Sequence, residues 1–293
     1  MDLVDELSGR ALFAVPKKGR LYEKCVQLLK NIDVRYIRKE RLDIAIVSNF
    51  NLALVFLPAH DIALYVSQGR VDMGITGQDI VAETEADVNE VMKLGFGQCR
   101  LCLLTPKKHK VGSSKELVGK RIVTSFPELT KKYFEKLAGN ENTHTSVRYV
   151  SGSVEIACPL GLAEGLVDLV ESGTTINAAG LEIIDVLMTT EAVLITNKHS
   201  PFQDLVDKLS KRIVGVITAE KFVMVEYNVE RKHLEAASKI TPGMQSPTVS
   251  PLEDNNWVAV KSMIKKDEAN EKLDQLQEIG ATAILITAIQ NCR

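Results

Sequence analysis

Apolar and polar residues alternate with two different periods over the first two-thirds of the chain. Short apolar runs of strand length predict strands at Ala11–Val15, Leu42–Val47, Leu52–Leu57, Val71–Thr76, Leu101–Thr105, Arg121–Ser125, Val147–Val150, Leu166–Val170 and Ala192–Thr196. Between several of these runs, apolar residues recur at helical spacing, namely Leu21, Cys25, Leu28, Leu29 and Ile32, and again Phe202, Leu205, Val206, Leu209 and Ile213. Strands that alternate with helices are typical of parallel sheets covered by helices. Because nine strands are many for one sheet, we expect two α/β lobes.

Two segments that resemble each other support this division. Residues Gly69–Ile80 and Gly165–Ile176 align without gaps, with Asp72 opposite Asp168 and a glycine in each turn at equal positions. Each segment has the pattern of a strand that ends in a hydroxyl-glycine turn and opens a helix. Chance is the alternative explanation, because such turns are common in α/β proteins. If a lobe is repeated, the two turns face each other and form a ligand cleft at the strand ends.

The final part of the chain has a different pattern. It predicts, in order, a strand, a helix, two strands, a helix and a strand, at Phe222–Asn228, Glu230–Ile240, Ser246–Ser250, Trp257–Ile264, Glu268–Ile279 and Ala281–Ile289. The order β-α-β-β-α-β is that of a ferredoxin-like domain.

Composition narrows the class of protein. The chain has 293 residues, 45% of them apolar and 25% charged, which is ordinary for a globular protein of two or three domains. The formal net charge of −2 does not indicate a nucleic-acid-binding surface. The acidic start of the chain is unlike a secretory signal, and no apolar stretch approaches the roughly 20 residues that cross a bilayer. We therefore expect a cytosolic protein that binds neither nucleic acid nor membrane.

The five cysteines do not indicate a metal site or a disulfide. Cys99 and Cys102 have the spacing of a redox or zinc motif. They lie in an apolar run that predicts a buried strand, on which positions three apart face opposite sides. No second cysteine or histidine pair completes a zinc site in the sequence, so we expect buried structural thiols.

The segment Asp168–Thr175 is the strongest candidate for chemistry. Asp168 lies on a predicted strand, and Ser172, Gly173, Thr174 and Thr175 follow at the start of a predicted helix. Glycine lets the backbone approach a phosphate, while hydroxyls and free N–H groups donate to its oxygens. The acidic side chain can accept from two ribose hydroxyls, so the pattern fits a sugar 5-phosphate. An ordinary capped helix explains the same residues equally well.

Two further turns carry candidate residues. The turn Pro16–Leu21 contains three cations around a glycine, which suits either a polyphosphate or a solvated surface turn. In the turn after Val150, Glu155 falls in the first turn of a helix. There it either contacts substrate or simply interacts favourably with the helix dipole.

These segments together resemble the ATP phosphoribosyltransferase family over the whole chain. The signature region of that family is matched by Glu155, Gly161, Ala163, Asp168, Leu169, Ser172, Gly173 and Thr175. Further similar blocks are Pro16–Leu21, Arg41-Leu42, Asp72–Gly77, Phe96-Gly97, Cys99-Arg100 and Thr124-Ser125, and, in the regulatory domain of the long form, Thr241–Gly243, Ser246–Val249 and Trp257–Val260. Together these matching blocks are specific for the family, although no single block is specific by itself. Gly95 stands where some relatives carry aspartate, so a carboxylate contact there is absent.

The resemblance implies a fold and domain boundaries. It implies two periplasmic-binding-like lobes with parallel-rich sheets and a C-terminal ferredoxin-like regulatory domain. The first lobe is expected to comprise residues 1–107 together with 192–213, after a crossover from the second lobe at 108–191. The regulatory domain is expected at 216–293.

The resemblance also implies a reaction and site residues. N1 of ATP would displace pyrophosphate from 5-phosphoribosyl 1-pyrophosphate to give N1-(5-phosphoribosyl)-ATP, the first step of histidine biosynthesis, with Mg²⁺ accompanying the pyrophosphate. No protein nucleophile is needed. The residues matched to the sugar phosphate are Asp168, Glu171, Ser172, Gly173, Thr174 and Thr175, and those matched to phosphates or ATP are Lys18, Arg20, Arg41, Asp72, Arg100 and Glu155.

Regulation by histidine is part of the same resemblance. It implies a homo-oligomer, from dimer to hexamer, that histidine inhibits by binding between regulatory domains. The matching positions for the histidine site are Glu226, Leu234, Thr248 and Ala283.

Two alternatives come from other classes of protein. A non-catalytic two-lobed solute-binding protein would have the same lobes, but the free cysteines and the added C-terminal domain disfavour it. A nicotinamide-dependent enzyme is disfavoured because the chain lacks the G-x-G-x-x-G fingerprint.

Overall fold

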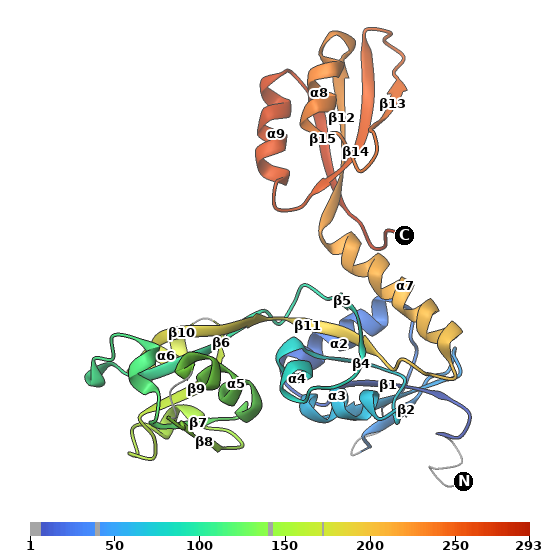
Figure 1. The fold of residues 1–293 in the computed structure, drawn as a ribbon. Helices are drawn as coiled ribbons and strands as arrows, with labels where there is room; N and C mark the ends of the chain where they lie inside the picture. The colour runs from blue at the N-terminus through green and yellow to red at the C-terminus, as the bar shows by residue number, and fades with distance from the viewer. Residues whose placement is uncertain (1–6, 39–41, 140–142, 172) are drawn as a thin grey trace. The chain divides into compact units, whose positions relative to one another are not determined.

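The computed structural model describes residues 7–38, 42–139, 143–171 and 173–293. By its contacts the chain divides into an N-terminal unit, residues 1–29 and 34–206, and a C-terminal unit, residues 30–33 and 207–293. Figure 1 shows the elements of both, from blue at the N-terminus to red at the C-terminus.

The first sheet of the N-terminal unit builds the first lobe. Its strands, in spatial order, are β2 (Ile44–Ile46), β3 (Leu52–Leu57), β1 (Ala11–Pro16), β4 (Met73–Gly77), β11 (Ala192–Thr196) and β5 (Asn89–Lys93). Its helices are α2 (Arg20–Asn31), α3 (Ala59–Ser67) and α4 (Gln78–Glu83). β1 is central and pairs in parallel with β3 and β4, so five of its six residues are buried. The apolar side chains of α3 pack on β1 and β11 through Ile62, Ala63 and Val66.

The second sheet builds the second lobe. Its strands, in spatial order, are β10 (Leu181–Thr190), β6 (Cys99–Pro106), β9 (Gly165–Val170), β7 (Arg121–Thr124) and β8 (Ser146–Tyr149). Its helical elements are η1 (Lys107–His109), η2 (Ser114–Leu117), α5 (Pro127–Ala138), η3 (Val154–Ile156) and α6 (Thr174–Ala178). The sequence assigned residues up to 107 to the first lobe, but β6 pairs with β10 and β9. The second lobe therefore begins earlier, at β6.

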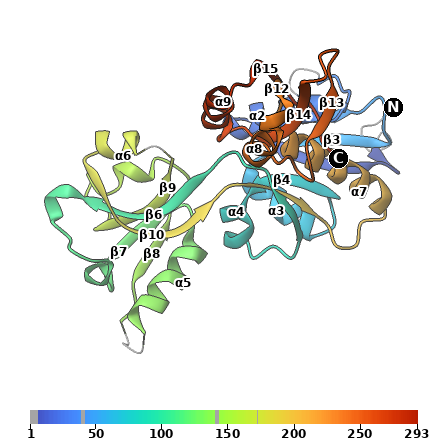
Figure 2. The ribbon, with the colours of Figure 1, turned by 90° about the horizontal axis from the view of Figure 1, so that it is seen from above.

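The chain returns to the first lobe through two consecutive strands. β10 runs antiparallel to β6 with two irregularities in register, and β11 then pairs antiparallel with β4 and β5. Figures 1 and 2 both show β10 and β11 following one path from the second sheet to the first. Neither β5 nor β10 was predicted from the sequence. β5 is a polar, largely exposed segment, and β10 is buried only at its two end residues and has no long apolar run.

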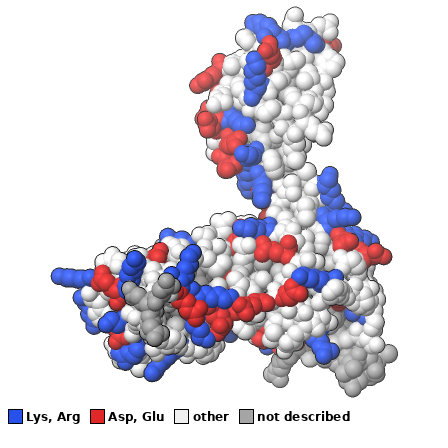
Figure 3. Space-filling view, viewed as in Figure 1, with Lys and Arg blue, Asp and Glu red and all other residues white. Residues whose placement is uncertain are grey.

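The C-terminal unit confirms the predicted ferredoxin-like domain. After α7 (Gln203–Glu220), the order is β12 (Phe222–Glu230), η4 (Arg231–His233), α8 (Leu234–Ile240), β13 (Thr248–Pro251), β14 (Trp257–Lys265), α9 (Ala269–Glu278) and β15 (Thr282–Ala288). The antiparallel sheet has the order β13-β14-β12-β15. Every second residue of β12 is buried against α8 and α9, as period-2 alternation requires. Figure 3 shows charged side chains of this unit gathered toward α9, while the surface over β13 is mostly uncharged.

The fold class is therefore as predicted, with two α/β lobes, whose sheets contain both parallel and antiparallel strand pairs, and a ferredoxin-like domain. Within the described part of the chain, none of the helices combines the length and apolar character needed to cross a membrane.

One ion pair anchors the parallel strands of the second lobe. Glu164, just before β9, accepts from the Arg121 guanidinium at 2.6 Å and from the Arg121 backbone N–H at 2.9 Å. The hydrogen bonds and charge of Arg121 lower the pKa of Glu164 from 4.5 to about 2. Because the folded pKa is depressed, the stabilisation is complete above pH 4.5 and is lost as pH falls through about 2.

We therefore predict that Glu164→Gln lowers the free energy of unfolding at pH 7 by about 1 kcal/mol or less, because both partners are partly exposed to solvent. Denaturant unfolding between pH 7 and pH 2 measures the difference from wild type, which should shrink below pH 4.5. A double-mutant cycle with Arg121→Met isolates the pair. A difference that stays constant down to pH 2 would contradict this account.

Candidate functional site

The start of α4 presents a buried carboxylate. Gly77 ends β4 and caps α4, and Asp79 lies in the first turn with only 5% of its surface exposed. Thr190, the last residue of β10, donates its hydroxyl to Asp79 Oδ1 at 2.8 Å and accepts from the Asp79 N–H at 3.0 Å. A Cβ on residue 77 would meet Asp79 Oδ1 at 2.1 Å, so only glycine leaves room for this carboxylate. Burial raises the pKa of Asp79, although the Thr190 hydroxyl and two backbone N–H groups oppose the shift.

Asp79 lines the larger of two cavities that share wall residues in the N-terminal unit, and its volume is about 510 Å³. Both lobes contribute to its wall. The first lobe and its returning strand supply Leu21, Glu23, Lys24, Ala59, Gly77, Asp79, Ile80 and Ala192, and the second lobe and the segment leading into it supply Gly97, Gln98, Cys99, Phe126, Leu169 and Glu171. Most of this wall is apolar, and Asp79 is the buried acid in it. Such a cavity fits a flat apolar group with a hydrogen-bond donor on its edge.

The smaller cavity, of about 180 Å³, adjoins the larger one. Leu169 and Glu171 line both cavities. Every described residue of its wall belongs to the second lobe, namely Leu104, Glu155, Leu166, Asp168, Leu169, Val170, Glu171, Gly173, Ile176 and Leu181. Four site residues that were predicted from the sequence thus lie together here, Glu155, Asp168, Glu171 and Gly173.

Two carboxylates interact within this smaller cavity. Burial raises the pKa of Asp168, and the charge of Glu155 raises it further, while a hydrogen bond from the Leu169 N–H at 2.8 Å lowers it. A carboxylate in this position gains from hydroxyl groups that donate to it, because they replace the water it has lost. The end of β9 is therefore suited to a polyhydroxylated ligand.

Gly173 supplies the conformation of the following turn. Its φ of +73° lies in the left-handed region, and a Cβ there would meet nothing within 4 Å. The turn therefore needs glycine for its backbone, and the space beside it is open to a ligand. Ser172 and the side chains of Thr174 and Thr175 lie outside the described part of the structure.

Lys18 and Arg100, the two predicted basic side chains that the structure describes, line neither cavity. Lys18 is exposed, while its neighbour Lys17 pairs with Asp43 at 2.6 Å and contributes to the lowered pKa of that carboxyl. Arg100 is exposed on β6 and lines neither cavity. Arg41 and the side chain of Arg20 are not among the described positions.

Asp72, which was expected to contact the nucleotide, lies away from both cavities. Its two carboxylate oxygens accept hydrogen bonds from the Leu12 N–H at 2.7 Å and the Ser200 hydroxyl at 2.6 Å, and it is 9% exposed. It precedes β4, at the end of the strand opposite to Gly77, and it lines neither cavity. Asp72 therefore connects Leu12 to Ser200 and lies outside the walls of both cavities.

The sequence repeat explains this error. Gly77 and Gly173 do occupy equivalent places, each just before a helix. The strands before them are offset, since β4 begins after Asp72 whereas β9 includes Asp168 near its end. The first lobe's carboxylate at the cavity is Asp79, which sequence reasoning missed. The feature of the sequence that could have identified Asp79 is an acidic residue two positions after the turn glycine Gly77, at the start of a helix.

A third cavity, of about 740 Å³, lies in the C-terminal unit. Thr248 on β13 lines it together with Lys261, which forms an ion pair with Glu226 at 2.5 Å. The other predicted regulatory residues lie elsewhere in this unit. Leu234 packs against the domain core, and Ala283 is exposed on β15, at the opposite edge of the sheet. Within one chain, the four residues predicted for the histidine site therefore do not all line the same cavity.

The described residues offer no resident metal site, because no three His, Cys, Asp or Glu side chains among them gather in a suitable group. The cysteines among them are free. Cys102 is buried in the second lobe's core, whereas Cys99 is half-buried and lines the larger cavity. Burial, with a smaller effect of the Asp79 charge, raises the pKa of Cys99 to about 11, so the thiol is neutral near pH 7.

Comparison with known proteins gives consistent matches over the chain. The family profile described as ATP phosphoribosyltransferase matches residues 58–215, and that described as HisG, C-terminal domain, matches residues 219–291. A protein named ATP phosphoribosyltransferase from Yarrowia lipolytica is 49% identical over 295 residues, with all of both chains covered. One of the same name from Saccharomyces cerevisiae is 46% identical over 297 residues, again with complete coverage. A solved ATP phosphoribosyl transferase (HisG:HisZ) complex from Thermotoga maritima has a TM-score of 0.58 and 26% identity, covering 69% of this chain and 97% of that chain.

The glycine at the smaller cavity allows a controlled test. Gly173→Ala adds a methyl group on the open side of the turn and costs about 1–2 kcal/mol for the left-handed conformation. Gly180→Ala is a matched control, because Gly180 follows the same helix with φ +67° and equally open space. We predict that both variants lose similar thermal stability, while only Gly173→Ala binds 5-phosphoribosyl pyrophosphate at least tenfold more weakly by calorimetry. Equal affinities in the two variants would remove Gly173 from the site.

Proposed function

Because the chain belongs to the ATP phosphoribosyltransferase family, we propose that the two adjoining cavities hold the two substrates of this pentosyl transfer. The enzyme performs the first step of histidine biosynthesis. The single observation that carries the assignment of the cavities is that Leu169 and Glu171 line both of them. Ligands bound in the two cavities would therefore meet at this shared wall.

The smaller cavity would bind 5-phosphoribosyl pyrophosphate. Asp168 would accept from the ribose hydroxyls, which suits a carboxylate whose pKa is raised by burial. The turn around Gly173, with Glu171, Ser172, Thr174 and Thr175, would bind the 5-phosphate through N–H and hydroxyl donors. Glu155 lines the same cavity and would contact the ribose or the approaching base.

The larger cavity would bind the adenine of ATP. Its apolar walls suit the faces of the base, and Asp79 can accept from the exocyclic amine at the base edge. The charge of the ionised carboxylate would favour the adenine ring as it becomes positive during attack. Lys18, Arg20, Arg41 and Arg100 remain proposed contacts for the phosphates of the substrates.

The reaction would then depend on alignment. N1 of the adenine forms a bond to the anomeric carbon of the ribose while the bond from that carbon to pyrophosphate breaks, and pyrophosphate leaves with the electron pair. Holding the two substrates in line can contribute about 7–11 kcal/mol to the rate. Enzymes of this family use a divalent metal ion. We take it to be Mg²⁺ that enters and leaves as part of the pyrophosphate substrate.

Histidine regulation is proposed for the C-terminal unit. Thr248 lines the 740 Å³ cavity, and Glu226 is connected to that cavity through Lys261. A free amino acid needs an acceptor for its ammonium group and donors for its carboxylate, which Glu226 and Thr248 can supply. Because Ala283 lies on the far edge strand and Leu234 is in the core, we propose that neighbouring copies complete the site in a dimer or hexamer. A cytoplasmic location also stays a prediction.

The assay that tests the function is release of pyrophosphate from ATP, 5-phosphoribosyl pyrophosphate and Mg²⁺. Release that depends on both organic substrates is expected. Asp168→Asn should lower kcat/KM at least tenfold, since a charge-assisted hydrogen bond contributes about 1.5–3 kcal/mol. Asp61→Asn, an exposed carboxylate on α3, is the control and should match wild type. No release by the wild-type protein would refute the proposed function, and full activity of Asp168→Asn would refute the proposed role of Asp168.

Thr248→Val tests the regulatory site without altering the cavities of the N-terminal unit. It replaces a hydroxyl by a methyl group of similar size, so assembly and catalysis should be retained. We expect the histidine concentration for half-inhibition to rise at least fivefold. Inhibition at the wild-type concentration would show that Thr248 does not contact the inhibitor.

A further inference from the structure

Helix α5 of the second lobe begins without a cap of its own. Its N-cap residue is Phe126, whose side chain cannot accept a hydrogen bond, and Pro127 follows at the first helical position. The next two N–H groups, of Glu128 and Leu129, have no acceptor within the helix, as at any helix start. An acceptor for them has to come from elsewhere in the chain.

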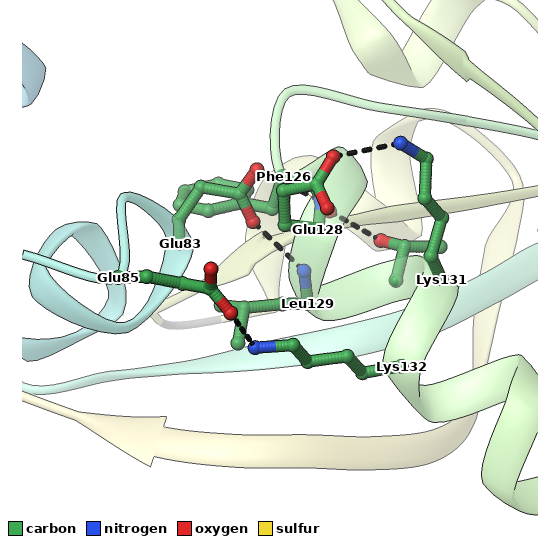
Figure 4. A network of polar contacts seen from close by, with 8 residues as sticks. Glu83, Glu85, Phe126, Glu128, Leu129, Lys131 and Lys132 are labelled. Carbon is green, nitrogen blue, oxygen red and sulfur yellow. Dashed lines mark hydrogen bonds and ion pairs between the residues drawn. The ribbon is translucent and has the colours of Figure 1, made fainter.

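The first lobe supplies that acceptor. Glu83, the last residue of α4, accepts from the Glu128 N–H at 2.9 Å through one carboxylate oxygen and from the Leu129 N–H at 2.9 Å through the other. Figure 4 shows the Glu83 side chain directed at the start of α5. Glu83 is only 6% exposed, so these bonds are largely shielded from water. An acidic side chain at a helix N-terminus is also favoured by the helix dipole.

Burial is the largest influence on the pKa of Glu83 and raises it, while the two N–H groups of α5 oppose the shift. The charges nearby are Glu128, which raises the pKa further, and His60 on α3, which lowers it. The second contact between these helices, the ion pair between Glu85 and Lys132, is exposed and contributes little by comparison. Glu83 is thus the principal polar link between α4 and α5.

The second lobe holds both ends of α4. At its start, Asp79 is fixed by Thr190 of β10, and at its end, Glu83 is fixed by the first turn of α5. Phe126, which precedes that turn, lines the larger cavity together with Gly77 and Ile80 of the first lobe. The two attachments of α4 therefore fix elements that line this cavity from both lobes.

We propose that Glu83 is a positioning residue that caps α5 across the two lobes and thereby sets the width of the nucleotide-binding cavity. The proposal rests on the assignment of that cavity to ATP. The described wall of the cavity for 5-phosphoribosyl pyrophosphate lies in the second lobe, so its shape does not depend on this link. Loss of the cap therefore weakens the binding of ATP and leaves that of the other substrate unchanged.

The first measurement uses the full-length protein without substrates. Amide hydrogen exchange should show the Glu128 and Leu129 amides about tenfold less protected in Glu83→Gln than in wild type, because glutamine offers one neutral acceptor oxygen in place of two charged ones. Amides deeper in α5, such as that of Phe134, should be unchanged and report that the helix is folded. Glu85→Gln is the matched control, since it removes the neighbouring acid and should leave all these amides protected.

The second measurement is steady-state kinetics with both substrates varied. We expect KM for ATP to rise about tenfold in Glu83→Gln, with kcat and KM for 5-phosphoribosyl pyrophosphate within twofold of wild type. A general loss of structure would lower kcat and disturb both substrates alike. Glu83→Asp keeps the charge but shortens the side chain, and it should give the same pattern if Glu83→Gln does not fold.

Wild-type protection of the Glu128 and Leu129 amides in the folded Glu83 variants would overturn the cap itself, whatever the enzyme's substrates are. Lost protection with an unchanged KM for ATP would overturn the link between the cap and the cavity. A failure of the proposed function would give a different result. The Glu83 variants would still lose protection of these amides, but the wild-type protein would release no pyrophosphate from the two substrates.

Discussion

The antiparallel pairing of β11 with β4 is the interaction on which the N-terminal unit depends. It places a strand from the end of the second lobe beside a central strand of the first, so the chain crosses between the lobes twice. Close packing fixes this arrangement, since β11 is fully buried and a Cβ on Gly74 of β4 would meet Ile62 at 2.5 Å. The pairing also brings Thr190, two residues before β11, to the start of α4. There it orients the buried acid Asp79 at the larger cavity.

The two cavities differ in how they are built, and this difference suits two substrates that bind separately and react together. The smaller is formed within one lobe, at the end of β9, and its charged residues come from a short stretch of chain and from Glu155. The larger is formed by both lobes and is mostly apolar, so its shape depends on contacts between α4, α5 and β10. A sugar phosphate needs fixed donors and acceptors, whereas a base needs a slot of the right width.

The sequence correctly grouped candidate residues that lie close together in the chain. Glu155, Asp168, Glu171 and Gly173 were predicted from one strand-turn-helix segment and its neighbour, and they do line one cavity. It failed where a role depends on distant partners. Asp79 is oriented by a hydrogen bond from Thr190, 111 residues away. Asp72 is held by hydrogen bonds from Leu12 and Ser200, 60 and 128 residues away, and does not line the cavity at which it was expected. The C-terminal domain was predictable because its two central strands, β12 and β14, alternate between buried and more exposed residues, while β5 and β10 lack that signal.

The central claim is that the two adjoining cavities hold the two substrates of the transfer, with the reacting atoms at the wall that Leu169 and Glu171 share. A crystal structure with 5-phosphoribosyl pyrophosphate and 1-deaza-ATP, which lacks the attacking nitrogen, tests this directly. The account predicts the sugar phosphate between Asp168 and Gly173, the base between Asp79 and Phe126, and the anomeric carbon facing position 1 of the base. A base bound outside the cavity lined by Asp79, or a sugar phosphate bound away from the end of β9, would contradict it.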